Sequence, residues 1–328
     1  ACVLMLAALL LASAGAAAAQ DVALARLAAD PPPDEVLAGL HDASLEHFHD
    51  RGILFENNRE ARWWRVTALR DMEAGLEPQL VLESPYSSRV EAWVPGGAQG
   101  SLHAIYGGTG DERYSARALV IPLPSGLAAG DSIWLRVFAP AGYPMQVSLA
   151  PRDEVHRADR SHVAWRSAIL TALLVLGLLA IGFWVGTGDR GYGYLSGMLL
   201  WALVFLVTVG GEVRSWPVLD PILAESPQLS RLAAMLGLIC SNLFQQRYLD
   251  MPRRLPRLSR VLDGITLVTA ALAAVTLFSA APAIPTIGNL ALIASALIAV
   301  IASSRLAWRG DRPALLLLAS WAPLALFA

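Results

Sequence analysis

The segment SAILTALLVLGLLAIGFWVGTG, residues 167–188, carries no charge over 22 residues. An α-helix needs about 20 predominantly apolar residues to cross the hydrocarbon core of a bilayer. We therefore predict a membrane-spanning helix here. A second uncharged block follows at 191–211, and a shorter one lies at 232–246 between Arg231 and Arg247.

The remaining apolar sequence predicts three more helices. Residues 264–304 carry no charge over 41 residues, which is too long for one span, and Pro282 and Pro285 near the middle divide them into two helices. A further apolar block begins at Pro313 and runs to the end of the sequence. We therefore predict a transmembrane bundle at residues 167–328, with five complete helices and a sixth that is cut short.

The composition agrees with a membrane protein and excludes several function classes. Hydrophobic residues make up 55% of the chain and charged residues 16%, and the mean hydropathy is +0.49. All 25 basic residues are arginine, so the sequence lacks the lysine of a Schiff base, a pyridoxal phosphate site or a Walker A loop. The formal charge of −2 gives no basic surface for nucleic acid. The two cysteines lie far apart, which excludes a disulfide framework.

The beginning of the sequence has the pattern of an export signal. An unbroken apolar core at residues 3–11 is followed by small residues and an Ala17-x-Ala19 site. We predict a signal peptide at residues 1–19. Residues 20–50 are polar and alanine-rich and contain three consecutive prolines, so we predict a linker with some helix there.

Residues 51–152 show the period of two that is typical of half-buried strands. Apolar and polar residues alternate after Trp64, and the alternation recurs around Val90, Ile133 and Met145. Glycine-containing turns separate these segments. Six or seven short strands with such turns are typical of an antiparallel sandwich, which we predict for this region.

The arginines predict the orientation of the helices. If the sandwich is exported, the loops on the inner side hold nine arginines and the intervening outer loops hold two. This bias agrees with the signal peptide. We therefore predict a multi-pass membrane protein whose N-terminal domain lies outside.

The sequence offers little evidence of catalytic or metal-binding patterns. Three histidines between residues 41 and 49 lie among acidic residues, but their spacing fits no familiar zinc site, and a solvated segment explains them better. The apolar blocks contain no Asp, Glu, His or Arg at mid-depth, which disfavours an ion-coupled transporter. No nucleophile or acid–base set is recognisable. We predict no catalytic residue, no metal site and no cofactor.

Three tryptophans are candidates for ligand binding. They fall on the polar register of their strands, beside arginines. An exposed ring next to a guanidinium can hold a sugar or planar ligand by stacking and charged hydrogen bonds. The alternative, favoured by the high frequency of aromatic residues in strands, is that each ring packs beneath a loop or a neighbouring domain. The candidate residues are Trp63, Arg65, Arg89, Trp93, Trp134 and Arg136.

Several short motifs, together with the architecture, point to one family. They are Trp63-Trp64-Arg65, Gly110-Asp111 followed by Arg117, Trp134-Leu135-Arg136-Val137, Gln246-Arg247-Tyr248-Leu249-Asp250 with Arg253-Arg254-Leu255-Pro256-Arg257-Leu258, and Arg309-Gly310-Asp311-Arg312-Pro313-Ala314. With these motifs the chain resembles the bacterial seven-transmembrane receptors with diverse intracellular signalling modules (7TM-DISM), in the form with a type 2 extracellular domain. The resemblance covers roughly residues 40 to 328.

This resemblance implies an all-β jelly-roll-like sandwich in the periplasm, followed by an all-α transmembrane helix bundle in the bacterial inner membrane. Residues 51–152 would then be a sensor domain for a periplasmic small molecule, for instance a carbohydrate. The resemblance also implies a cytoplasmic output domain, often a diguanylate cyclase or a histidine kinase, and it is compatible with a homodimer. The sequence contains no motif of either enzyme, so we expect no catalysis from these residues.

Two hypotheses for the function of this chain remain open. The leading hypothesis is the sensory half of a membrane receptor, in which ligand binding to the sandwich shifts a two-state helix bundle. The alternative is a membrane scaffold or small-solute transporter, for which Asn242, Gln245 and Gln246 are the most polar groups inside the bundle. Hydrogen bonds between helices explain these amides better than conduction does. A membrane enzyme has the least support.

Overall fold

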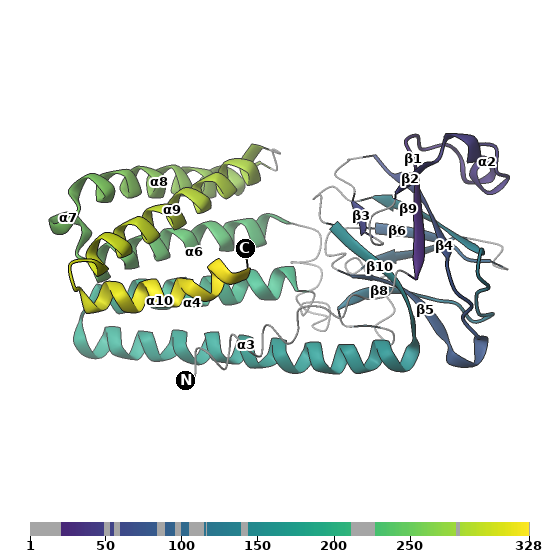
Figure 1. Ribbon diagram of the computed structural model, residues 1–328. Helices are drawn as coiled ribbons and strands as arrows, with labels where there is room; N and C mark the ends of the chain where they lie inside the picture. Colours follow the sequence, from purple (N-terminus) through teal and green to yellow (C-terminus); the bar gives the residue numbers. More distant parts are fainter. Residues whose placement is uncertain are drawn as a thin grey trace. The chain divides into compact units, whose positions relative to one another are not determined.

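The structure, a computed structural model, describes residues 21–48, 53–55, 60–83, 89–95, 100–104, 115, 117–138, 144–210, 227–279 and 283–327. The chain forms two compact units, and the division after the last strand falls between Arg166 and Ser167. We call them the β unit and the helical unit; Figure 1 labels their strands and helices. The predicted signal peptide at residues 1–19 lies outside the described residues.

Within the described residues, the β unit holds two antiparallel sheets. The larger sheet has the order β2-β1-β4-β9-β6-β7 and the smaller has the order β3-β10-β5-β8. The strands of the larger sheet are β1 (Val22–Leu27), β2 (Glu46–Phe48), β4 (Arg62–Ala68), β6 (Arg89–Trp93), β7 (Ser101–Ala104) and β9 (Ser132–Phe138). The strands of the smaller sheet are β3 (Ile53–Phe55), β5 (Pro78–Glu83), β8 (Ala118–Pro122) and β10 (Pro144–Pro151).

The two sheets share one apolar core, as the period of two predicted. In the larger sheet, Val66 of β4 lies opposite Ile133 of β9, and both side chains are buried. The smaller sheet contributes Leu80 and Ile121 to the same core. Burying one such side chain stabilises the fold by about 1.5–3 kcal/mol. The predicted antiparallel sandwich is therefore confirmed, whereas its jelly-roll connectivity stays a prediction.

The prediction of a linker at residues 20–50 is wrong, because this segment supplies two strands of the larger sheet. β1 pairs with β4 along its whole length, from Val22 opposite Ala68 to Leu27 opposite Trp63. The strand has buried residues on both faces of the sheet. A strand covered on both faces has no clear alternation in its sequence, which is why the periodicity did not reveal it. The predicted short helix does occur, as α2 (Pro33–Leu37).

β10 is followed directly by helix α3 (Arg152–Thr187), which begins well before the uncharged block at 167. Its first turns pack on the face of the smaller sheet that points away from the shared core. There Val155 joins Val81, Ala118 and Val120 in a separate apolar cluster. This cover explains why β5 and β8 are buried on both faces.

The helical unit contains the apolar part of α3 and a series of further helices. Each apolar block that predicted a helix corresponds to one of them. The further helices are α4 (Arg190–Val209), α6 (Pro227–Tyr248), α7 (Met251–Arg254), α8 (Pro256–Thr276), α9 (Ala283–Ala307) and α10 (Arg312–Phe327). Among the described helices, α3, α4, α8 and α9 are long and apolar enough to cross a membrane. This is therefore a multi-pass membrane protein, and the total number of spans stays a prediction.

Glycines allow three of these helices to approach closely. A Cβ atom at Gly177 of α3 would lie 2.8 Å from Cδ2 of Leu200 on α4. A Cβ atom at Gly197 of α4 would lie 2.7 Å from Sγ of Cys240 on α6. Small residues at such crossings are typical of membrane helices, whose association depends on close packing.

Leu135 tests the shared core, because it lies in the inner strand β9 with no exposed surface. We expect Leu135→Ala to lower the free energy of unfolding by about 2–5 kcal/mol, through lost burial and the cavity left behind. Leu102 on β7 is 44% exposed, so Leu102→Ala should change it by at most about 0.5 kcal/mol. Chemical denaturation of the full chain, followed by tryptophan fluorescence, measures both. Equal losses would contradict the core assignment.

Candidate functional site

The three candidate tryptophans come together on the outer face of the larger sheet, the face that points away from the shared core. Their strands β4, β9 and β6 are neighbours. The ring centroids of Trp63 and Trp93 lie 4.7 Å apart, and those of Trp63 and Trp134 lie 6.5 Å apart. Trp63 has no exposed surface, unlike the exposed ring that the ligand-binding hypothesis needs, whereas Trp93 and Trp134 are half-buried.

Residues 28–45, which connect β1 to β2, cover this face and are called the cover segment here. Val36 and Leu45 of the segment pack into one apolar cluster with Trp63. The indole Nε1 of Trp63 donates a hydrogen bond to the carbonyl oxygen of Pro31 at 3.1 Å. The rings therefore pack beneath a loop, which is the alternative that strand propensity favoured.

Arg136 fastens the cover segment to the sheet. Its Nε and one terminal nitrogen donate to the two carboxylate oxygens of Asp30 at 2.8 and 2.7 Å. Its other terminal nitrogen lies 3.3 Å from Glu91 on β6. The hydrogen bond to Asp30 is the main cause that raises the pKa of Arg136 above its ordinary value, so the guanidinium stays charged.

Arg65 makes a second, weaker attachment. Its guanidinium lies 3.4 Å from the carboxylate of Asp42 in the cover segment. The same group lies over the ring of Trp134, with its central carbon 5.8 Å from the ring centroid. A cation above an aromatic face contributes about 0.5–1 kcal/mol at an exposed site.

Arg89 is not part of this group of side chains. It starts β6, on the same face as Trp93 but four residues earlier, which is about 13 Å along a strand. The structure therefore brings five of the six candidates together: Trp63, Arg65, Trp93, Trp134 and Arg136. Because the cover segment occupies them, a sugar or planar ligand would have to displace it.

Other chemistry is sparse in the part of the chain that the structure describes. That part holds no group of three or more His, Cys, Asp or Glu side chains that could bind a metal ion. His41, one of the clustered histidines, pairs with Glu35 at 3.0 Å in the cover segment.

A second polar region, at the start of α3, was missed from the sequence. Asp159 is buried against the smaller sheet, where the hydroxyl of Ser115 donates to it at 2.9 Å and the Nε of Arg117 lies 3.3 Å away. Arg152 pairs with Glu77 at the same face. The sequence did contain one indication of this region, because Val155 and Asp159 are four residues apart and so share one face of a helix. They lie between the alternating strand pattern and the uncharged block at 167, and neither of those patterns includes them.

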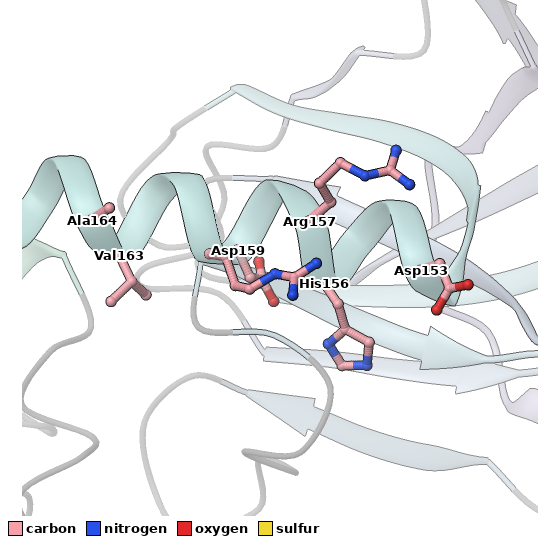
Figure 2. A pocket seen from close by; sticks show the side chains of 7 residues that line it. Asp153, His156, Arg157, Asp159, Val163 and Ala164 are labelled. Carbon is pink, nitrogen blue, oxygen red and sulfur yellow. The ribbon is translucent and has the colours of Figure 1, made fainter.

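An open pocket lies along the same part of α3. Figure 2 shows the side chains that line it, among them Asp153, His156 and Arg157. Acidic and basic groups are mixed along this lining, and its apolar residues lie together at one end. The pocket therefore has no single sign of charge and indicates no ligand class.

The amides of the helical unit pair between helices α6 and α8. The side-chain nitrogen of Asn242 donates to Thr266 at 3.1 Å, and that of Gln246 donates to Asp263 at 2.8 Å. Interhelical hydrogen bonding is thus confirmed for these two residues. Gln245 instead bonds to Ser241 within its own helix.

Asp30 tests the attachment of the cover segment. We expect Asp30→Ala to speed hydrogen exchange of the backbone amides in residues 28–45 about two- to fivefold, since a partly exposed ion pair contributes up to about 1 kcal/mol. Hydrogen-exchange mass spectrometry of the full chain measures this. Asp34→Ala is the matched control, because Asp34 is an exposed carboxylate of the same segment. The same exchange rates in both variants would show that Asp30 does not hold the segment.

Comparison with known proteins identifies the helical part of the chain. Residues 163–328, half of the chain, match the family model described as 7TM diverse intracellular signalling. Comparisons with curated proteins and with solved structures give no match. The family match does not reach the strands, so the type 2 extracellular domain stays a prediction. The match includes the apolar part of α3 and every later helix, and the chain therefore belongs to the 7TM-DISM family of membrane sensory receptors.

Proposed function

We propose that this chain is the sensory and transmembrane portion of a bacterial inner-membrane signalling receptor. The β unit would be the periplasmic sensor domain, exported by the signal peptide at residues 1–19. The helical unit would relay its state to a cytoplasmic output, a diguanylate cyclase or a histidine kinase. The family membership and the arginine bias of the loops support this orientation. A homodimer is the assembly that we propose.

The observation that carries the proposal is the continuity of α3. Residues of α3 up to Arg166 belong to the β unit, and those from Ser167 belong to the helical unit. Asp159 and Val155 attach the first part to the smaller sheet. A rearrangement of that sheet would therefore act on the same helix that provides the first apolar span.

We infer that the ligand is a carbohydrate and that it competes with the cover segment. A sugar offers an apolar ring face for Trp134 and hydroxyl groups for Arg65 and Arg136. A ligand shifts an equilibrium only if it prefers one state. Since the cover segment occupies these side chains, the sugar would bind only the uncovered state.

The sensing role can be tested with the full chain in nanodiscs and a panel of neutral and acidic sugars. We expect one sugar to raise the unfolding temperature by roughly 5 °C at about a hundredfold excess over its Kd. Trp134→Ala and Arg136→Gln should abolish the shift. Arg70→Gln, which removes a guanidinium paired with Asp21 elsewhere in the β unit, should keep it. No shift with any sugar, or a shift that survives in both site variants, would contradict the proposed site.

The relay can be tested at Asp159. We expect Asp159→Asn to speed hydrogen exchange of the backbone amides at residues 152–160 severalfold, because the charge facing Arg117 and the hydroxyl of Ser115 is lost. Asp153→Asn is the control, since Asp153 is exposed on the same helix. Mass spectrometry of both variants measures the exchange. Equal protection in the two variants would show that α3 does not depend on Asp159 for its attachment.

A further inference from the structure

An apolar groove runs between α8 and α9 in the helical unit, where the two helices lie side by side (Figure 1). Its volume is about 400 Å³. Hydrocarbon side chains and one glycine form its walls, so it offers no hydrogen bonds to a polar ligand. Its lining includes Val261, Gly264 and Val268 of α8 and Ile287, Leu290 and Ala294 of α9.

The two helices are antiparallel. Leu262 near the start of α8 shares an apolar cluster with Ile298 and Leu306 near the end of α9. Ala273 near the end of α8 shares another with Ile284 at the start of α9. The first turns of α8 and the last turns of α9 therefore lie at the same end of the groove.

Three arginines continue the groove walls at that end. Arg257 precedes Val261 by four residues and Gly264 by seven, so it lies on the same face of α8. Arg260 precedes Gly264 by four. Arg305 follows Ile287 by 18 residues, about five helical turns, and so lies on the groove face of α9.

These arginines are available for a ligand. All three are exposed, and none forms an ion pair with another residue that the structure describes. Their neighbour Arg254, in contrast, is paired with Asp311 at 2.9 Å. Three unpaired guanidiniums beside an apolar groove favour a molecule with an anionic head and a hydrocarbon tail.

The dimensions fit such a molecule. Arg257 and Val268 are 11 residues apart, which is about 16 Å along a helix. One leaflet of a bilayer with a core of about 30 Å is about 15 Å deep. A phosphate near Arg257 would thus let an acyl chain extend along the groove as far as Val268.

We propose that the groove between α8 and α9 binds one anionic diacyl phospholipid. Its phosphate contacts Arg257, Arg260 and Arg305, and one acyl chain lies along the apolar walls. A helix of a second copy would also match the walls, but it would leave the three guanidiniums without a partner. The site depends on membrane insertion and is independent of any ligand of the β unit.

Native mass spectrometry tests this proposal. The full chain in a nonionic detergent is mixed with equal amounts of phosphatidylglycerol and phosphatidylcholine that have identical acyl chains. We expect one retained phosphatidylglycerol per chain, in preference to phosphatidylcholine by on the order of tenfold. Arg257→Gln with Arg260→Gln should abolish the preference. Arg309→Gln with Arg312→Gln removes two charges outside the groove walls and should keep it.

A second variant separates the groove from general charge attraction. A Cβ atom at Gly264 would meet nothing within 4 Å, so the side chain of Gly264→Leu starts in the open space of the groove and should abolish retention. Gly182 on α3 is equally open, and Gly182→Leu should keep the lipid.

Three outcomes would overturn the proposal. The first is an unmodified chain without lipid preference, and the second is lipid retention that survives Gly264→Leu. The third is a dimer without lipid that Gly264→Leu dissociates, because the groove would then bind a second copy.

Discussion

Helix α3 must pair its own backbone hydrogen-bonding groups, and this requirement shapes the β unit as well as the membrane part. A chain that enters hydrocarbon must pair its own N–H and C=O groups, because the bilayer core offers no partners. This protein meets that requirement early, since α3 begins directly after β10 and well before the apolar block. One side of the polar turns that come first, with Val155 and Asp159, then covers a sheet face. The burial of β5 and β8 on both faces follows from this arrangement.

The sequence predicted the elements whose signal is local. An uncharged block predicts a membrane helix by itself, and the alternation in β4 and β9 predicts a strand with one buried face. β1 escaped prediction because it is buried on both faces, so its pattern is not one of simple alternation. The exposure of the tryptophans could not be predicted for a different reason. Whether Trp63 is exposed depends on the cover segment, and the key pair of that contact, Arg136 with Asp30, joins residues 106 positions apart.

The outer face of the larger sheet shows how one set of groups can serve two purposes. Rings beside guanidiniums suit a sugar, and the same chemistry suits a loop that carries carboxylates. The pair of Arg136 with Asp30 is partly exposed, 33% and 28% for the two side chains, so the attachment is modest in energy. A ligand of ordinary affinity could therefore displace it.

In the helical unit, the side-chain amide nitrogens of Asn242 and Gln246 already form hydrogen bonds between α6 and α8. This pairing disfavours a role for these two amides in solute transport.

The apolar contact of Val155 with the smaller sheet has a practical consequence for cutting the protein. A fragment that ends at Pro151, the last residue of β10, would lose the helix turns that cover Val81, Ala118 and Val120. That apolar strip would then face water on β5 and β8, two paired strands whose exposed hydrophobic surface favours aggregation. Arg117 would also lose Asp159. A water-soluble fragment of the β unit should therefore keep the chain to about Arg166, after which α3 belongs to the helical unit.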